Sequence, residues 1–496
     1  MTIRVSPNEG LVLAVDLGTT NVKALLVDPA TRRIVRRGSV PVDVHRPADG
    51  WVEQDGEQLW GAVCGAVAEC LADGAVPAGI AISNQRESVA AWTVDGGLLG
   101  PVLGWQDART AAWCADPAQA DLARIAPDIT GLTLDPMFSA PKLRWLLDRH
   151  GGVPGLRLGT LDTWLVDRLT GEFLAEAGNA SRTLLLDLAT LDYSPELLAG
   201  FGIPRSVLAP VVASDAGFGV TREGLPVPAG VPVVAVLADS HAALYLHGSG
   251  RPGEGKVTYG TGSSIMVSVP GAEAPAPLAE PVVARTLAWQ TDVPVYAYEG
   301  NIVASGAALE AMARILTGGD VGALDALART VGRGSGLSFV PAFTGLAAPW
   351  FDRGAVPLLA GITGATTPGH VALAAFEAVA HQVGDVIAAV DRLAPGALTT
   401  VHADGGATAS ALLMQLQADV LGRPLHVAAA PEASALGVAA LAARALDLPV
   451  AAAEEGRQVH PDPTQGWVST SRARWRDAID RSRGHAVHHT VFAIEG

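Results

Sequence analysis

Two turns rich in glycine and threonine contain the residue types that bind anions. The first begins at Asp16 and continues through Gly18, Thr19 and Thr20, and the second is Gly260-Thr261-Gly262-Ser263. Glycine lets the backbone approach an anion closely, consecutive N–H groups form an anion-binding concavity, and an aspartate can hold Mg²⁺ directly or through water. One such turn is equally consistent with an ordinary hairpin. Two that face each other across a cleft could hold a triphosphate from both sides.

A neighbouring arginine and glutamate follow an apolar segment early in the chain. Arg86 and Glu87 come just after the strand expected over Gly79–Ser83. Together they offer the hydrogen-bond donors and acceptors that binding to the vicinal hydroxyls of a polyol requires. The alternative is a solvent-exposed ion pair at the end of a strand. Trp105 could form an apolar wall beside a carbon chain, although a lone tryptophan is more often part of the core.

An aspartate ends the central apolar strand. Asp239 follows the strand expected over Val231–Leu237 and precedes a short helix expected over His241–Gly248. It could be a general base that takes a hydroxyl proton while the oxygen attacks phosphorus, or it could cap the helix. Ser240 and His241 do not indicate a Ser-His-Asp triad, because adjacent residues point in different directions and no G-x-S-x-G turn occurs.

The elements around these residues suggest two related halves. The segment Leu11–Asp28 predicts a β-hairpin around the first turn, and Gly255–Val269 predicts a second hairpin with the same plan. A stretch rich in glycine and proline, Gly248–Gly255, is suited to a hinge. We therefore expect two domains, residues 1–250 and 251–496, with a cleft between them.

Helices are predicted in the second half of the chain. One has Thr367 as its N-cap and ends before Pro395, a second spans Ser410–Leu421, and a third spans Ala433–Ala445. Each follows a loop rich in Gly, Thr or Ser, and a helix N-terminus beside such a loop is an anion site by geometry. Strands that alternate with helices predict an α/β protein.

Composition limits the partners and the compartment. The 496 residues include 34 Lys and Arg against 50 Asp and Glu, a net charge of −16, which repels nucleic-acid backbones and anionic lipid surfaces. No apolar run approaches the length of about 18 residues that a membrane span needs. The 3 cysteines form no C-x-x-C pair, which favours a reducing compartment. We expect a cytoplasmic protein with neither nucleic-acid nor membrane partners.

Many segments, in the same order, resemble the FGGY family of carbohydrate kinases, and among them most closely the glycerol kinases. The similar pieces run over nearly the whole chain and include AVDLGTTNVKALLVD, ISNQRESVAAW, GWQDART, GLTLDPMFSAPKLRW, VTYGTGSS and DGGATASALLMQLQADVLG. The resemblance implies the two-domain actin/hexokinase-like (ribonuclease H-like) ATPase fold, with ATP and Mg²⁺ as cofactors. It also implies transfer of the γ-phosphoryl group to a hydroxyl group of a small polyol or ketose, and a homodimer as a common assembly.

The resemblance assigns roles residue by residue. It implies that Asp16 holds Mg-ATP, that the two turns contact the phosphates, and that a third group lies near the base and ribose. Asp239 would be the general base of the acceptor site. The implied acceptor residues are Arg86, Glu87, Trp105 and Asp239. The implied nucleotide residues are Asp16, Gly18, Thr19, Thr20, Lys23, Gly260, Thr261, Gly262, Gly306, Gly406, Ala407 and Ser410.

The departures from the glycerol kinases lie mostly in the acceptor site. Met137 replaces a tyrosine, Ser240 a glutamine and Ser264 an aromatic residue, whereas Lys23 replaces an arginine and Ser410 an asparagine in the nucleotide site. Loss of a polar partner for a substrate hydroxyl can cost about 1 to 3 kcal/mol, and serine in place of an aromatic ring opens volume. We therefore expect an acceptor of four or five carbons. The alternatives are glycerol kinase activity itself and a non-catalytic, actin-like regulator that binds ATP.

Overall fold

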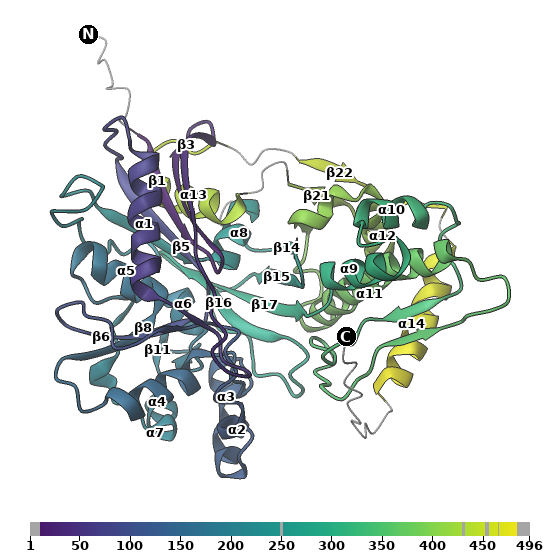
Figure 1. The fold of residues 1–496 in the computed structure, drawn as a ribbon, viewed down its shortest axis with the longest axis horizontal. Coiled ribbons are helices and arrows are strands. Elements are labelled where there is room, and N and C mark those ends of the chain that lie inside the picture. The colour runs from purple at the N-terminus through teal and green to yellow at the C-terminus, as the bar shows by residue number, and fades with distance from the viewer. Residues whose placement is uncertain (1–9, 249–250, 429–431, 452–455, 465, 484–496) are drawn as a thin grey trace, which may run out of the picture. The chain divides into compact units, whose positions relative to one another are not determined.

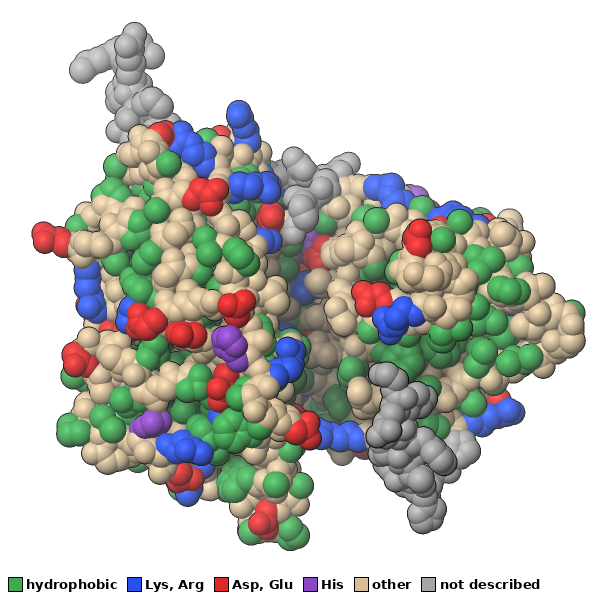
Figure 2. Space-filling model, viewed as in Figure 1, with side chains coloured by type: hydrophobic (Ala, Val, Ile, Leu, Met, Phe, Trp, Pro, Cys, Tyr) green, Lys and Arg blue, Asp and Glu red, His purple; other side chains and the backbone are tan. Residues whose placement is uncertain are grey.

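The chain divides into two compact units. The computed structural model describes residues 10–248, 251–428, 432–451, 456–464 and 466–483 (Figure 1). The first unit comprises Met1–Gly253, Ser268–Tyr298 and Glu432–Ala453, and the second comprises Glu254–Val267, Glu299–Pro431 and Glu454–Gly496. Two segments beyond residue 250 thus belong to the first unit. One of them contains a helix that covers the central sheet of that unit. On the face drawn in Figure 2, acidic and basic side chains are interspersed.

A five-stranded sheet is the centre of the first unit, with the strand order β13-β5-β1-β2-β3. The strands are β1 (Val12–Leu17), β2 (Asn21–Asp28), β3 (Arg33–Pro41), β5 (Gly79–Asn84) and β13 (Val233–Ala238). β1 and β2 form the antiparallel hairpin that the sequence predicts, with Asp16 opposite Lys23. β5 runs parallel to both β1 and β13. The carboxyl ends of these three strands therefore lie at one edge of the sheet.

Helices cover both faces of this sheet. α1 (Gly56–Cys70) packs against β2 and β3, and its apolar residues share a core with Leu13, Val15 and Leu17 of β1. The alternate residues of β1 face the other side of the sheet. There α13 (Ala433–Ala445) packs against β1, β5 and β13 (Figure 1).

The helix that carries Asp239 is held by a close contact with α13. α8 (Asp239–Gly248) follows β13 directly and packs against α13. The sequence predicted this helix from His241, but it begins at Asp239, because the preceding strand extends through Ala238. Gly437 of α13 permits the close approach, since a Cβ atom there would overlap the carbonyl oxygen of Ala242. The position of Asp239 therefore depends on the packing of these two helices.

Smaller elements complete the first unit. A four-stranded sheet has the order β4-β7-β6-β8, and two further sheets pair β10 with β11 and β12 with β9. These strands are β4 (Glu53–Gln54), β6 (Val89–Thr93), β7 (Val102–Leu103), β8 (Leu156–Thr160), β9 (Ala175–Glu176), β10 (Leu186–Asp187), β11 (Asp192–Tyr193) and β12 (Val211–Val212). The helices are α2 (Ala111–Cys114), η1 (Pro117–Gln119), α3 (Ala120–Thr130), α4 (Ser139–His150), α5 (Leu161–Thr170), α6 (Ala177–Ser181), α7 (Pro195–Phe201) and η2 (Arg205–Val207).

The second unit contains the other predicted hairpin. β14 and β15 pair antiparallel around the glycine turn, and β14 runs parallel to β20. The strands are β14 (Glu254–Tyr259), β15 (Ser263–Val269), β18 (Ser338–Val340), β19 (Leu358–Ala360), β20 (Thr400–Asp404), β21 (Leu425–Val427) and β22 (Arg457–Val459). Of the two remaining strands, β16 (Ala284–Gln290) belongs to the first unit, and β17 (Pro294–Ile302) passes from the first unit to the second. The helices are α9 (Gly306–Leu316), α10 (Val321–Ala328), α11 (Pro368–Leu393), η3 (Gly406–Ala409), α12 (Ala411–Leu421) and α14 (Trp467–Arg483).

The three helices predicted in the second half are confirmed as α11, α12 and α13. Thr367 and Ser410 are the N-cap residues of α11 and α12, and α12 ends at Gly422 in the left-handed conformation. By length and composition alone α11 could cross a membrane, but 89% of its most apolar window is buried inside the structure. Burial of that extent is what a core helix shows.

We expect Gly437→Ala to destabilise the protein although alanine is the better helix former. The added methyl group must push α13 away from α8, which should lower the free energy of unfolding by about 1 to 3 kcal/mol. Gly61→Ala in α1 is the matched control, because a Cβ atom at Gly61 meets nothing within 4 Å, and it should stabilise by about 0.5 to 1 kcal/mol. Thermal unfolding of both variants checks this. Equal stabilisation by both would show that the two helices are not in tight contact.

Candidate active site

The carboxyl edge of the first unit's sheet collects several residues that the sequence singled out. Asp16 lies beside Ser83 in the parallel register of β1 and β5, and Asn84 lies beside Ala238 in that of β5 and β13. Arg86 and Asp239 therefore follow neighbouring strands at the same edge. In an open sheet with parallel strands, the carboxyl ends are the usual place for a ligand.

The first glycine turn is tied to the loop after β5. Gly18 donates its N–H to the carbonyl of Asn21 at 3.1 Å, and a Cβ atom at Gly18 would lie 2.9 Å from that oxygen, so the turn itself requires glycine. The Thr19 hydroxyl donates to Oε1 of Gln85 at 3.2 Å, and Gln54 Nε2 donates to the Thr19 carbonyl at 2.8 Å. Thr20 is exposed.

Trp105 is fixed against the same turn. Its indole Nε1 donates to the Thr19 hydroxyl at 3.2 Å, and its backbone N–H donates to the Ser88 hydroxyl at 3.0 Å. The tryptophan is 37% exposed. The interpretation of Trp105 as a core residue is therefore wrong, because the hydrogen bonds hold the ring at the surface of the site.

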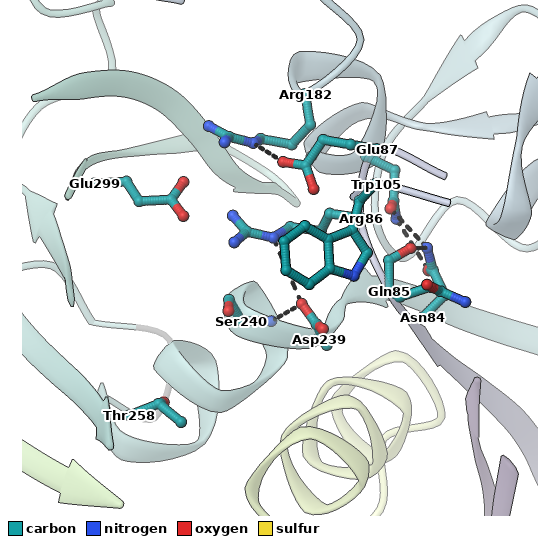
Figure 3. Close-up of polar contacts among 12 residues, drawn as sticks. Asn84, Gln85, Arg86, Glu87, Trp105, Arg182, Asp239, Ser240, Thr258 and Glu299 are labelled. Carbon is teal, nitrogen blue, oxygen red and sulfur yellow. Dashed lines mark hydrogen bonds and ion pairs between the residues drawn. The ribbon is translucent and has the colours of Figure 1, made fainter. Parts of the chain in front are cut away.

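Arg86 and Glu87 each pair with a different partner. The Nε atom of Arg86 lies 3.5 Å from Oδ1 of Asp239, and Arg182 donates from Nε to Oε1 of Glu87 at 2.8 Å (Figure 3). The side chains of Arg86 and Glu87 are only 10% and 6% exposed. The alternative of a solvent-exposed ion pair is wrong. Glu87 also has a φ angle of 61°, a conformation that is costly for any residue with a side chain.

The carboxylate of Asp239 contacts the loop after β5. Its Oδ1 accepts from the backbone N–H of Ser240 at 2.5 Å and pairs with Arg86, and the side chain is 40% exposed. The ion pair with Arg86 and this exposure favour a carboxylate directed outward from α8, as Figure 3 shows beside Trp105 and Arg86. Ser240 is half-buried at the same helix start.

Burial raises the pKa of Asp16. Loss of solvent, with smaller contributions from the charges of Asp239 and Glu432, raises this pKa to about 6, although a hydrogen bond with Ser83 and the charge of Lys23 act to lower it. Lys23 forms an ion pair with Glu432, with Nζ 2.7 Å from Oε2. The resting protein therefore holds a desolvated carboxylate beside two other acidic groups and one lysine. Such a site favours the binding of a cation.

Met137 lies beside a buried lysine. Nζ of Lys142 donates to the carbonyl oxygens of Met137 and Gly104 at 2.6 and 3.2 Å. Lys142 has no exposed surface, and loss of solvent lowers its pKa to about 8. The lysine thus links the backbone at Met137 to the residue before Trp105.

The second unit holds the other implied nucleotide residues. The carbonyls of Gly260 and Thr261 accept from the first N–H groups of α9, with Gly306 N donating to Gly260 O at 3.0 Å. A Cβ atom at Gly262 would overlap the carbonyl of Ile302, whereas one at Gly406 would meet nothing within 4 Å. Gly406 and Gly260 are exposed and leave their backbone open to a ligand. Half-buried members of the set are Gly262, Gly306, Ala407 and Ser410, and Ser264, which the resemblance assigns to the acceptor site, is half-buried as well.

Two helix N-termini predicted as anion sites have other partners. The Ser410 hydroxyl accepts from Leu413 N at 3.1 Å and donates to Asp325. At the start of α13, Glu432 takes Lys23 as its partner. A hydroxyl cap uses a free N–H group, and a carboxylate repels a second anion. The N-termini of α12 and α13 are therefore poor anion sites in this state.

Sequence reasoning missed the partners that hold these residues. Arg182 pairs with Glu87, Glu432 pairs with Lys23, and Gln85 joins Thr19 to its neighbours. Pairs between residues far apart in the chain produce no recognisable pattern in the sequence around either residue. The available signals were weak: Arg182 is a lone charge in a run of small and apolar residues, and Glu432 precedes a helix where a capping residue is expected.

Comparisons with known proteins agree with the geometry. Residues 11–245 match the N-terminal domain of the FGGY family of carbohydrate kinases, and residues 255–446 match its C-terminal domain. The chain is 39% identical over 494 residues to the apulose kinase of Pectobacterium atrosepticum, covering 95% of this chain and 98% of that protein. It is 36% identical over 500 residues to a glycerol kinase of Geobacter sp., covering 95% and 99%. The crystal structure of Plasmodium falciparum glycerol kinase with ADP superposes with a TM-score of 0.87 at 24% identity, covering 95% and 98%, which shows a shared fold.

We expect Asp16→Asn to stabilise the metal-free protein at neutral pH. The folded-state pKa of about 6 lies above the ordinary aspartate value of 3.8. Between these values the folded state keeps a proton that the unfolded state has lost, so the free energy of unfolding falls as pH rises. The asparagine variant should be more stable by about 1 to 3 kcal/mol near neutral pH. The difference should vanish as pH falls below about 4. Thermal unfolding in EDTA across this range checks the prediction, and a variant less stable than the parent at neutral pH would contradict it.

Proposed function

The chain belongs to the FGGY family of carbohydrate kinases, and from this premise we propose that it transfers the terminal phosphoryl group of ATP to a small polyol or ketose with Asp239 as general base. One observation carries the assignment of the base. Asp239 is directed outward from its helix and contacts Arg86 at the edge where β1, β5 and β13 end. A carboxylate in that place can take the proton of a hydroxyl group that Arg86 helps to position.

The acceptor is held by groups with complementary hydrogen-bonding roles. Arg86 supplies N–H donors, the carboxylate of Glu87 supplies acceptor oxygens, and Trp105 supplies an exposed apolar face. A vicinal diol needs both donors and acceptors. The three side chains are fixed by Asp239, Arg182 and the first glycine turn, so little conformational entropy is lost when an acceptor binds.

The residues present fit Mg-ATP. Asp16 is a desolvated carboxylate with a raised pKa, which a divalent cation would neutralise. No group of three or more potential metal ligands occurs in the part of the chain that the structure describes, so Mg²⁺ would take its other ligands from water and phosphate, as it does in many nucleotide sites. When bound, Mg²⁺ neutralises charge on the phosphoryl oxygens during in-line transfer.

Lys23 and the two glycine turns supply the remaining nucleotide contacts. Lys23 lies opposite Asp16 in the first hairpin and can turn from Glu432 toward a phosphate. In the second unit, the open backbone at Gly260 and Gly406 suits the phosphates and the nucleoside. We assign Gly18, Thr19, Thr20, Thr261, Gly262, Gly306, Ala407 and Ser410 to the same nucleotide. The three cysteines are free thiols, which supports a reducing, cytoplasmic location.

We propose that the acceptor is larger than glycerol. Met137 and Ser240 lack the hydroxyl and the amide that a glycerol kinase would offer there, and Ser264 leaves the space of an aromatic ring. Among the relatives, an apulose kinase is 39% identical and glycerol kinases are 36% to 38% identical, so an acceptor other than glycerol occurs among proteins of equal similarity.

Asp239→Asn should lower kcat by about 10² to 10⁴-fold and leave the Kd of Mg-ATP within about twofold, because the amide keeps the shape of the side chain but cannot take a proton. ADP release with and without acceptor, together with calorimetric titration of ATP, measures both. Asp148→Asn is a matched control, since Asp148 is 58% exposed and pairs with Arg144 at 2.8 Å. Unchanged acceptor-dependent ADP release in Asp239→Asn would rule out this residue as the base.

A screen of glycerol, erythritol, pentitols, ketopentoses and apulose should give a higher kcat/KM for a four- or five-carbon acceptor than for glycerol. The double variant Met137→Tyr and Ser240→Gln should shift the preference toward glycerol by about tenfold or more, because it restores two polar partners. Coupled detection of ADP gives the constants. A clear preference of the unchanged protein for glycerol would refute the larger acceptor.

A further inference from the structure

The short segment Glu176–Arg182 contacts the last residue of β5 and the loop that follows this strand. It comprises the end of β9, the helix α6 and the C-cap residue Arg182. Arg182 reaches Glu87, and Asn179 reaches Asn84. The loop that bears Arg86 and Glu87 is therefore held from one side by a single segment about a hundred residues later in the chain.

The first contact fixes one carboxylate. Arg182 Nε lies 2.8 Å from Glu87 Oε1, with side-chain exposures of 1% and 6%. The arginine is itself placed by Phe138, whose ring centroid lies 5.2 Å from its guanidinium carbon. A planar guanidinium accepts a carboxylate in few orientations. Figure 3 shows the Glu87 carboxylate with one oxygen toward Arg182 and the other turned away from it.

The second contact fixes the loop's backbone. The side-chain amides of Asn179 and Asn84 exchange hydrogen bonds at 2.9 and 3.3 Å, and Asn84 Nδ2 also donates to the Gln85 carbonyl at 3.0 Å. Asn179 is oriented by the buried carboxylate of Glu176, which accepts from its backbone N–H at 2.7 Å and its side chain at 3.0 Å. Glu176 accepts in turn from the Ser214 hydroxyl at 2.6 Å. Every link in this series is buried.

Stability alone does not explain such an ion pair. A buried pair is often no more stabilising than apolar residues of the same volume, because both charges must be desolvated. The φ angle of 61° at Glu87 adds a further cost. A strained residue that is held by several contacts is typical of a functional site, where the surrounding structure imposes an orientation.

We propose that Arg182 is a positioning residue for the acceptor: it fixes the Glu87 carboxylate so that the second oxygen is presented to an acceptor hydroxyl, while Asn179 holds the same loop through Asn84. This inference rests on the proposed function, since it takes Glu87 as an acceptor contact. In this role Arg182 acts through Glu87. Loss of Arg182 should therefore weaken acceptor binding and leave Mg-ATP binding unchanged.

The test uses Arg182→Gln and Arg182→Lys in the full chain, with apulose, D-xylulose and glycerol as acceptor probes. Arg182→Gln should lower kcat/KM for the acceptor by about tenfold or more, mainly through KM, and leave the Kd of Mg-ATP within about twofold. Arg182→Lys should give a kcat/KM for the acceptor between those of Arg182→Gln and the unchanged protein, because lysine keeps the charge but not the planar geometry. Arg157→Gln is the control: it removes a half-buried arginine of this unit, 20% exposed, which pairs with Asp167 at 2.5 Å. Any effect of this change should fall equally on acceptor and Mg-ATP binding.

The outcomes distinguish this inference from the function on which it rests. If Glu87→Gln lowers acceptor kcat/KM but both Arg182 variants leave acceptor KM unchanged, the positioning role is overturned and the function stands. If Glu87→Gln leaves kcat/KM unchanged for every acceptor tested, the assignment of Glu87 to the acceptor site fails. An equal loss of acceptor and ATP affinity in the Arg182 variants, matching Arg157→Gln, would also overturn the positioning role. Arg182→Lys keeps the test valid where Arg182→Gln does not fold.

Discussion

Charged side chains with little exposure stand where β1, β5 and β13 end, and each of them needs a partner. An ionised group withdrawn from water costs several kcal/mol unless another charge or hydrogen bond compensates it. Glu87 has Arg182, and Arg86 has Asp239. Asp16 is compensated less well, and its pKa of about 6 reflects this. The resting protein therefore keeps one poorly compensated carboxylate at this edge of the sheet, and the proposed Mg²⁺ would neutralise it.

Neutral hydrogen bonds connect the two parts of the site within the first unit. Gln85 accepts from the hydroxyls of Thr19 and Ser88, and the same two hydroxyls accept from the side chain and the backbone of Trp105. The glycine turn and the tryptophan wall thus share one small network. Because such networks tolerate few geometries, a movement of the glycine turn would also move the ring of Trp105, which the proposed function places beside the acceptor.

Local patterns predicted the elements well and the contacts poorly. The two hairpins, α11, α12 and α13 follow from turn residues, capping residues and apolar periodicity, all of which act over a few positions. The pair of Lys23 and Glu432 joins residues 409 positions apart, and only the finished fold brings them together. The alternatives for Arg86, Glu87 and Trp105 depended on exposure, which a single sequence does not reveal. Resemblance to a family named the site residues, but it did not name Arg182, which holds one of them.

One buried lysine supports the backbone next to two of the proposed acceptor residues, Met137 and Trp105. Lys142 donates to the carbonyl oxygens of Met137 and Gly104, so its contacts are with the backbone and not with groups that depend on the side chain at position 137. Burial makes the ammonium costly, as its lowered pKa of about 8 shows, yet three hydrogen-bond donors on one atom can bridge two carbonyls that no apolar residue could join. A change of side chain at Met137 would therefore leave these backbone hydrogen bonds in place. If Met137 and Ser240 line the acceptor as proposed, substitutions there would change substrate preference without altering the charged residues at the strand ends.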